Sequence, residues 1–274
     1  MQYAPTKVTN YLGAVLVGQQ LKEIYLYREM LKNLVAKELR ARYKGSVLGF
    51  FWTFFNPLLM LIVYSVVFSF VMRVQTENYA MFLFVALLPW NYFATSVLQG
   101  AASLVQNGSL IKKIYFPREI LPLSVVLTNL INYLLSLFIL IPALLIFKID
   151  LTLALIAFPA ILIIETLLVI SLTFLVAIAN VYFRDLEHIM GVLMTAWFFL
   201  TPVLYPTDII PQKARFIFGL NPVTPIIEAY RNIFYAGKWP QWDVLGYLTL
   251  GLLALVIISL AAFGRFQKTV AEEI

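Results

Sequence analysis

The chain has 274 residues, of which 62% are hydrophobic and only 12% are charged, and its mean hydropathy is +0.87. Soluble domains average roughly 45–50% apolar and ~25% charged residues, so this composition excludes an ordinary soluble protein and indicates an integral membrane protein. The absence of cysteine and the presence of a single histidine, His188, argue against disulfides, thiolate chemistry and a histidine-based metal centre. The net charge of +6 points to membrane topology rather than to nucleic acid.

The first 46 residues are expected to stay on the protein and in the cytoplasm. The apolar stretch LGAVLV at 12–17 is shorter than the roughly 7–15-residue core of a secretory signal. From Leu21 to Tyr43 apolar residues recur at helical spacing, which predicts a basic amphipathic helix lying in the membrane interface. A helix packed on a soluble domain is the alternative, but the chain has no such domain to cover. The apolar positions are Ile24, Tyr27, Leu31, Leu34, Val35 and Leu39, and the opposite side carries Lys32, Lys37, Arg40 and Lys44.

Six apolar runs are long enough to cross a bilayer, at about 20 residues each. They lie at 47–72, 79–101, 120–147, 151–181, 188–205 and 242–263. With the N-terminus inside, the inside segments hold 14 of the 20 Lys and Arg residues, as the positive-inside rule requires. The prediction is an all-α integral membrane protein with six transmembrane helices and both termini in the cytoplasm, in which 1–46 is a cytoplasmic segment and 47–274 the transmembrane domain.

The cytoplasmic loop between the second and third spans, residues 102–119, is too apolar for a solvated turn. Its sequence NGSLIKKIYFPRE predicts a short helix that ends before Pro117, because a proline disfavours the helical conformation of the residue before it. Such a helix would present Tyr115 and Phe116 to a cytoplasmic partner. Anchoring of these two rings at the lipid headgroups is the alternative.

The segment 206–241, between the fifth and sixth spans, is apolar but interrupted by prolines. Pro206, Pro211, Pro222 and Pro225 divide it into pieces too short to cross the bilayer. Short helices at membrane depth are tolerated only where protein or water covers their ends. The sequence therefore predicts re-entrant or interfacial helices at the outer mouth of the protein.

The sequence offers little catalytic chemistry. Its only Gly-Lys pair, Gly237-Lys238, lacks the first glycine and the Ser or Thr of a phosphate-binding loop, so the chain is not expected to hydrolyse ATP itself. No catalytic residue and no metal ligand set is predicted. Glu165, the one acid inside a span, suggests proton coupling, but a protonated carboxyl bonded across helices is the simpler explanation. The nearest polar candidates are Asn129 and Asn132 on the third span.

Aromatic residues crowd two places, the start of the first span (FFWTFF, 50–55) and the middle of the fifth (WFF, 197–199). Flat rings can bind the apolar faces of sugars weakly enough to let a glycan slide. The interfacial aromatic belt, for the first cluster, and core packing remain the alternatives.

The order of these features resembles the membrane subunit of bacterial polysaccharide ABC exporters of the Wzm/TarG type, which export O-antigen, teichoic acid and capsule. The similarity is carried by ARYKGSVLGFFWTFFNPLLMLIVYSVVF, KKIYFPREILPLSVVLTNLINYLLSL, ANVYFRDLEH, and TPVLYPTDIIP with LNPVTPIIEAYRNIFY. These stretches follow one another in order on a frame of six spans and cover nearly the whole chain.

The resemblance implies a homodimer in the bacterial inner membrane, two copies of a separate ATPase that binds ATP and Mg²⁺, and a polyprenyl-pyrophosphate-linked polysaccharide as cargo. It also implies roles for individual residues. The residues expected to dock on the ATPase and couple it to transport are Lys112, Lys113, Ile114, Tyr115, Phe116, Pro117, Arg118 and Glu119. The resemblance implies that the aromatic start of the first span lines the glycan path, and from the two aromatic clusters we predict Phe51, Trp52, Phe55, Trp197 and Phe198 as path residues. A cytoplasmic entrance gate falls on Lys37, Arg40, Arg42 and Tyr43.

Among the polymers of this family the sequence favours O-antigen, because RYKGSVLGFFWTFFNPLL is closer to O-antigen exporters than to the teichoic acid branch. A proton- or ion-coupled secondary transporter that uses Glu165 is the alternative from another class. A membrane enzyme acting on polyprenyl lipids is a third possibility, but the charged clusters expected of it are missing.

Overall fold

The structure is a computed structural model, and it describes residues 13–43, 51–67, 78–213, 215–267 and 273. Within these ranges the chain is helical and contains no strand. The helices are α1 (Gly13–Leu26), α2 (Arg28–Tyr43), α3 (Trp52–Tyr64), α4 (Tyr79–Gln106), α5 (Gly108–Lys113), α6 (Ile120–Ile146), η3 (Leu153–Ala157), α7 (Phe158–Tyr182), α8 (Leu186–Leu200), η4 (Thr207–Ile209), α9 (Arg215–Gly219), α10 (Val223–Phe234) and α11 (Trp242–Phe266).

Four helical stretches are long and apolar enough to cross a membrane: α4, α6, η3 with α7, and α11. They coincide with the second, third, fourth and sixth predicted spans. The shortest of them, the 25-residue α11, is about 38 Å long at 1.5 Å per residue, which exceeds the ~30 Å hydrocarbon core of a bilayer. Four of the predicted spans are therefore present as helices that are long and apolar enough to cross a bilayer.

The first and fifth predicted spans are shorter in the structure. Apolar helix covers Trp52–Val67 in the first, while the predicted ends of that span lie outside the described residues. The predicted fifth span, 188–205, is wrong at its C-terminal end, because α8 stops at Leu200 and a turn follows. The 15 residues of α8 measure about 22 Å. The count of six spans and the position of the termini stay predictions.

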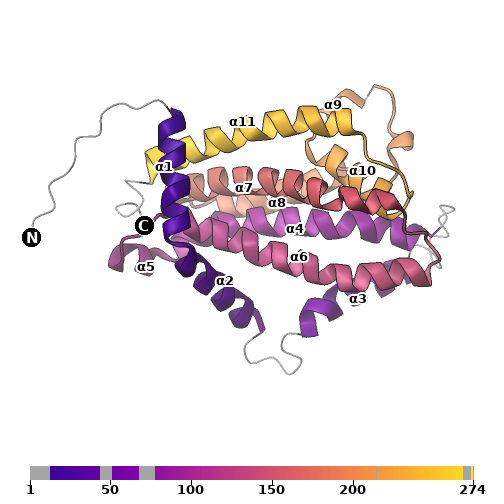
Figure 1. Cartoon of the computed structure of the whole chain (residues 1–274), viewed down its shortest axis with the longest axis horizontal. Coiled ribbons are helices and arrows are strands. Elements are labelled where there is room, and N and C mark those ends of the chain that lie inside the picture. The colour runs from indigo at the N-terminus through magenta and orange to yellow at the C-terminus, as the bar shows by residue number, and fades with distance from the viewer. Residues whose placement is uncertain (1–12, 44–50, 68–77, 214, 268–272, 274) are drawn as a thin grey trace, which may run out of the picture.

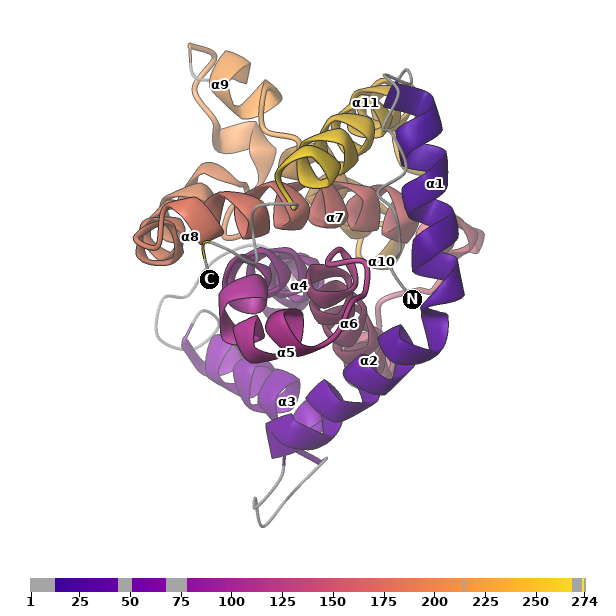
Figure 2. The same ribbon diagram turned by 90° about the vertical axis from the view of Figure 1, so that its left-hand side faces the viewer.

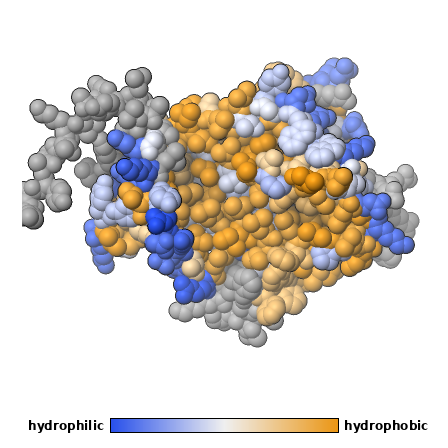
Figure 3. Space-filling model, viewed as in Figure 1, coloured by the Kyte–Doolittle hydropathy of each residue, from blue (hydrophilic) through white to orange (hydrophobic). Residues whose placement is uncertain are grey.

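The helices form a bundle whose two ends differ in character (Figure 1). One end, the α5 end, gathers α1, α5 and the last turns of α11, all from segments predicted to be cytoplasmic; the other, the α10 end, carries α9 and α10. On the face shown in Figure 3 an apolar belt covers the middle of the molecule, with hydrophilic residues at both ends. This arrangement agrees with the predicted topology.

The predicted amphipathic N-terminal helix is present, but it is two helices that meet at Tyr27 and begin earlier, at Gly13. Its apolar side packs on the chain's own helices, since Tyr27, Leu31 and Leu34 contact a buried cluster at the α5 end. Lys32, Lys37 and Arg40 are exposed, as predicted. The apolar face is thus largely used for tertiary packing, which the prediction of a helix lying only in the interface did not include.

The segment 206–241 folds as predicted into short pieces, η4, α9 and α10. One detail of the prediction is wrong, because Pro225 does not interrupt a helix. It lies in the first turn of α10, where a backbone N–H has no helical acceptor and proline is tolerated.

Helix α4 lies in the middle of the bundle, between α6 and α7, as the view from the α5 end shows (Figure 2). The close approach of α4 to α7 depends on Gly100. A Cβ atom at Gly100 would lie 2.1 Å from Cγ2 of Thr173 on α7, a distance that real atoms do not adopt. The two backbones can approach each other here only because position 100 has no side chain.

Gly100→Ala should lower the free energy of unfolding by about 1–3 kcal/mol, because the added methyl group forces α4 and α7 apart. The thermal unfolding temperature of the purified protein measures this loss. Gly251→Ala on α11 is the control, since a Cβ atom there meets nothing within 4 Å. Thr173→Ser, which removes Cγ2, should restore most of the loss in the double variant. Equal stability of the Gly100→Ala variant and the wild type would contradict this packing.

Candidate functional site

The segment Lys112–Glu119 at the α5 end combines exposed and buried residues. Helix α5 ends at Lys113, earlier than predicted, and the chain then runs extended to Pro117. Tyr115 is 84% exposed, whereas Phe116 is only 4% exposed and belongs to the buried cluster of this end. The expectation that both rings are presented to a partner is therefore wrong for Phe116. The exposed residues are Lys112, Lys113, Ile114 and Tyr115, and beside them is a hollow that Arg118 also lines.

Glu119 is buried at the end of this segment and is held by the N-terminal helix. The Nε2 atom of Gln20 on α1 donates to Glu119 Oε1 at 3.2 Å and to the carbonyl of Leu260 on α11 at 3.1 Å. Burial raises the pKa of the Glu119 carboxyl. Gln20 thus links α1, the start of α6 and α11 directly behind the exposed residues of the segment. The side-chain amide fits against α11 because residue 264 is glycine, where a Cβ atom would lie 2.2 Å from Gln20 Nε2.

Of the predicted entrance-gate residues, Lys37 and Arg40 lie on the exposed side of α2. The Arg40 guanidinium donates to the carbonyl of Ala36 at 3.1 Å, one turn earlier in the helix. Arg42 and Tyr43 belong to the last turn of α2, and their side chains lie outside the described part of the structure.

The first group of predicted path residues lies on α3. Phe51 is 65% exposed and Phe55 is 38% exposed, so both rings face away from the bundle of this subunit. Trp52 is half-buried between α3, α4 and α6, with its ring centroid 6.4 Å from that of Phe55.

The second group of predicted path residues, on α8, is packed against the bundle. The ring centroid of Trp197 lies 5.2 Å from that of Phe93, in an edge-to-face arrangement. The ring centroid of Phe198 lies 5.4 Å from that of Trp90. Phe93 and Trp90 both belong to α4. The indole N–H of Trp197 donates to Asn221 Oδ1 at 2.9 Å. Phe199, which the sequence analysis did not select, is the exposed ring of this cluster.

Asn221 connects the end of α8 to the start of α10. Its Oδ1 atom also accepts from the backbone N–H of Val223 at 3.0 Å, and its Nδ2 atom donates to Thr201 Oγ1 at 2.8 Å. An asparagine that binds the N–H two residues ahead is a common way to start a helix. The same amide therefore positions α10 and holds Trp197 in place.

Arg231 on α10 anchors the turn that follows α8. Its guanidinium donates to the carbonyls of Pro202, Val203 and Tyr205, and its Nε atom to that of Phe82 on α4. The same group lies 3.7 Å from the centroid of the Phe82 ring. Four carbonyls and a ring face thus surround a buried charge.

Glu165 on α7 is 2% exposed and pairs with α10. The hydroxyl of Tyr230 donates to Glu165 Oε2 at 2.6 Å. Tyr133 of α6 packs edge-on against the Tyr230 ring at 6.1 Å. The partner comes from the Pro-rich segment and not from the third span, where the sequence analysis had looked for it.

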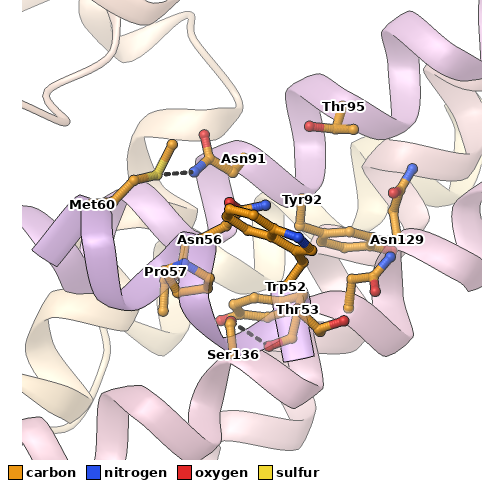
Figure 4. Close-up of a pocket in the computed structure, with 13 residues that line it drawn as sticks. Trp52, Thr53, Asn56, Pro57, Met60, Asn91, Tyr92, Thr95, Asn129 and Ser136 are labelled. Atoms are coloured by element: carbon orange, nitrogen blue, oxygen red, sulfur yellow. Dashed lines mark hydrogen bonds between the residues drawn. The ribbon is translucent and has the colours of Figure 1, made fainter. Parts of the chain in front are cut away.

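Two polar cavities lie along α4. The amide pocket, of about 280 Å³, lies between α3, α4 and α6, and its walls combine uncharged polar side chains with aromatic and aliphatic surface (Figure 4). A larger cavity of about 730 Å³ lies nearer the α5 end, where Gln99, Gln106, His188, Glu38 and Glu187 contribute to its lining. Asn129 Nδ2 donates to Gln99 Oε1 at 3.0 Å and so joins the linings of the two cavities. The polar residues of the amide pocket include Trp52, Asn56, Asn91, Thr95, Asn129 and Asn132.

The sequence profile of ABC-2 type transporters matches residues 29–235, most of the described bundle. The chain belongs to the ABC-2 type transporter family of membrane proteins. The family resemblance drawn from the sequence motifs is confirmed, and the chain is an integral membrane protein.

Named relatives cover nearly the whole chain. The O-antigen export system permease protein RfbA of Myxococcus xanthus is 40% identical over 93% of this chain and 98% of its own length. A protein of the same name from Klebsiella pneumoniae is 33% identical over 90% of this chain and 95% of its own length. The polysialic acid transport protein KpsM of Escherichia coli is 22% identical over 85% of this chain and 92% of its own length.

Sequence reasoning missed the residues that hold the α10 end of this ABC-2 subunit together. Arg231 and Tyr230 lie side by side in an apolar stretch whose charged residues are Glu228 and Arg231, and charges in such a stretch are a signal that could have drawn attention to them. Asn221 stands directly before Pro222 and the start of α10, a typical helix-capping position. Nothing in the sequence indicated that Gln20 reaches Glu119.

The Glu165–Tyr230 pair predicts different effects for two similar changes. Glu165→Gln keeps an oxygen acceptor for the Tyr230 hydroxyl, so the unfolding temperature should stay close to that of the wild type. Glu165→Leu leaves that hydroxyl buried without its acceptor and should lower the free energy of unfolding by about 1–3 kcal/mol. Thermal unfolding of both purified variants measures the difference. Loss of transport in a fully stable Glu165→Gln variant would instead support proton coupling.

Proposed function

We propose that this chain is the transmembrane subunit of an ATP-driven exporter that moves a polysaccharide, with O-antigen favoured, out of the cytoplasm. The observation that carries the proposal is the 40% identity to an O-antigen export permease over 98% of that relative's length. In the proposed exporter the chain is a non-catalytic subunit of the bacterial inner membrane, and a separate ATPase supplies the energy by binding ATP and Mg²⁺.

The exposed residues Lys112–Tyr115 are the proposed docking surface for the ATPase. They project at the α5 end, on the side of the bundle that also carries the basic helix α2 (Figure 2). Tyr115 is 84% exposed and the neighbouring Ile114 is 55% exposed, and exposed aromatic and apolar side chains of this kind are typical of protein-binding surfaces. Glu119, at the end of this segment, accepts a hydrogen bond from Gln20 on α1, and Gln20 also donates to α11. A displacement of the segment by the ATPase would therefore move α1 and α11 as well as α6.

We further propose that two copies of the subunit enclose the glycan path. Three aromatic rings are exposed in this subunit: Phe51 directly before α3, Phe55 on α3 and Phe199 on α8. A second subunit related by a two-fold axis would present each ring twice around a shared channel. Trp197 and Phe198 lie one layer deeper and support Phe199 from the α4 side.

The proposed cargo is a polysaccharide on a polyprenyl pyrophosphate lipid. The exposed Lys37 and Arg40 on α2 are placed to attract its anionic headgroup at the membrane surface. Flat rings then offer the glycan contacts that need no fixed hydrogen-bond register.

A proton-coupled secondary transporter is not favoured. Proton relays require a chain of titratable groups, and the described neighbours that bond to Glu165 are limited to the Tyr230 hydroxyl. The pair ties α7 to α10, which is a structural role.

Tyr115→Ala and Phe116→Ala should have opposite consequences, although the two residues are adjacent. Tyr115→Ala should weaken association with the ATPase several-fold at an unchanged unfolding temperature, because the Tyr115 ring is 84% exposed. Phe116→Ala should lower the free energy of unfolding by about 3–5 kcal/mol, as expected for a buried ring. Co-purification with the ATPase and thermal unfolding measure the two effects. Normal ATPase association of the Tyr115→Ala variant would argue against docking at this surface.

Deletion of the gene in its own bacterium should stop polysaccharide from reaching the cell surface and leave lipid-linked polymer inside. Surface staining with a polymer-specific antibody and extraction of the lipid-linked fraction measure both outcomes. The wild-type gene should restore surface polysaccharide to the deletion strain. It should not do so in a strain whose partner ATPase is inactivated in its nucleotide site. A deletion strain with normal surface polysaccharide would refute the proposed function.

A further inference from the structure

The amide pocket contains hydrogen-bonding groups that the protein itself does not use. Both polar atoms of the Asn132 side chain are shielded from water and have no hydrogen-bond partner among the described residues. Asn91, on the facing helix α4, donates to the sulfur of Met60 at 3.8 Å, and a thioether is a weak acceptor. A shielded amide without a partner, such as that of Asn132, destabilises a fold, so its presence here calls for a ligand.

The walls of the pocket define the chemistry of that ligand. None of the described residues that line the pocket is charged. The amides of Asn91 and Asn132 each offer donors and an acceptor, as a hydroxyl does, while Trp52 and the stacked rings of Tyr92 and Tyr133, 5.7 Å apart, add flat apolar surface. An anion would find no cation here, and a lipid chain would leave the amides unpaired. A neutral sugar, with hydroxyls at its edge and an apolar face, matches both kinds of wall.

The size and shape of the pocket indicate how much of a glycan it can hold. Its volume of about 280 Å³ lies just below the roughly 300–1,000 Å³ of most small-molecule sites, which suits a single sugar unit and not an extended chain. The exposure of the lining residues decreases across the pocket. Asn56 on α3 is exposed, Asn91 and Thr95 are half-buried, and the amide atoms of Asn132 on α6 are shielded from water. The exposed ring of Phe55, proposed above to face the glycan path, directly precedes Asn56 on α3, and Phe51 directly precedes that helix. Figure 4 shows Asn56 at the pocket.

We propose that the amide pocket binds one uncharged sugar unit of the exported glycan and thereby favours neutral over anionic polymers. The inference rests on the proposed function and specifies its cargo. The sugar lies against Trp52, and its hydroxyls bond to the amides of Asn91 and Asn132. A sugar carboxylate or a backbone phosphate enters the pocket poorly, because no positive charge offsets its lost hydration.

The test measures sugar binding by the full-length chain in lipid nanodiscs, which avoid glycoside detergents. Saturation-transfer NMR is recorded with two neutral probes, mannotetraose and a rhamnose tetrasaccharide, and with one anionic probe, a tetramer of sialic acid. The wild type should bind at least one neutral probe and should bind the anionic probe at least tenfold more weakly.

Asn132→Leu separates a binding role from a structural one. It should weaken binding of the neutral probe about tenfold, as expected for one lost hydrogen-bonding group. The unfolding temperature should be unchanged or higher, because a buried amide without a partner is replaced by an apolar side chain of similar size. Asn91→Leu, on another helix, should weaken binding similarly and decides the question if the Asn132 variant does not fold. Gln19→Leu, which removes an exposed amide on α1, is the matched control and should bind as the wild type does.

Three outcomes would overturn the inference: no binding of either neutral probe by the wild type, equal binding of the anionic probe, or unchanged binding by whichever of the two variants folds. A loss of binding that accompanies a matching loss of stability would assign Asn132 a structural role and would also overturn it. The export assay with the gene deletion is independent of these measurements. If the wild-type gene restores export while neither neutral probe binds, the proposed function stands and the amide pocket is not a sugar site.

Discussion

The Arg231 guanidinium, surrounded by main-chain carbonyls, is the interaction on which the α10 end of the bundle depends. The turn after α8 and the short helices η4, α9 and α10 leave backbone groups without helical partners, and such groups are costly at membrane depth. The Arg231 side chain donates hydrogen bonds to the carbonyls of Pro202, Val203 and Tyr205 and also to the carbonyl of Phe82 on α4. Irregular chain can therefore lie against an apolar bundle without an unpaired turn. Because α10 carries this residue, its docking on α4 and α7 also determines where α8 ends and where the ring of Trp197 lies.

The same requirement for internal partners explains the other polar residues of the bundle. Glu165 is bonded by Tyr230, and Asn221 uses both ends of its amide to connect α8, α10 and Trp197. Some shielded polar atoms have no partner among the described residues, including the hydroxyls of Ser96 and Thr173 within the bundle. Two further cases lie beside proposed binding surfaces. Asn132 in the amide pocket and Nη1 of Arg118 beside the exposed loop have no partners among the described residues. Both lie at surfaces for which an external partner is proposed, a glycan for the first and an ATPase for the second.

The two proposed surfaces are mechanically connected through few contacts. Glu119 and Gln20 join the docking segment to α1 and α11, and the segment continues directly into α6, which carries Asn129 and Asn132 on one side of the amide pocket. The opposite side of that pocket is α4, held tightly to α7 by the absence of a side chain at Gly100. A displacement of α6 relative to α4 would change the width of the pocket. This geometry gives the proposed exporter a direct route from the ATPase to the glycan.

The sequence by itself determined the membrane character, four long spans, the division of the Pro-rich segment into short helices and the family, because these follow from local composition, periodicity and ordered motifs. The sequence also selected Lys112–Tyr115, Phe51 and Phe55, which are exposed in the structure, while their roles in coupling and in the glycan path stay predictions. It could not separate Tyr115 from Phe116, because adjacent residues of an extended segment face opposite ways and only packing decides which side is buried. The pairs Glu165–Tyr230 and Gln20–Glu119 join residues 65 and 99 positions apart, and the amides of the pocket come from three helices. Only the tertiary structure decided these, since hydrogen-bond partners across helices depend on the rotation and approach of each helix, which no local pattern encodes.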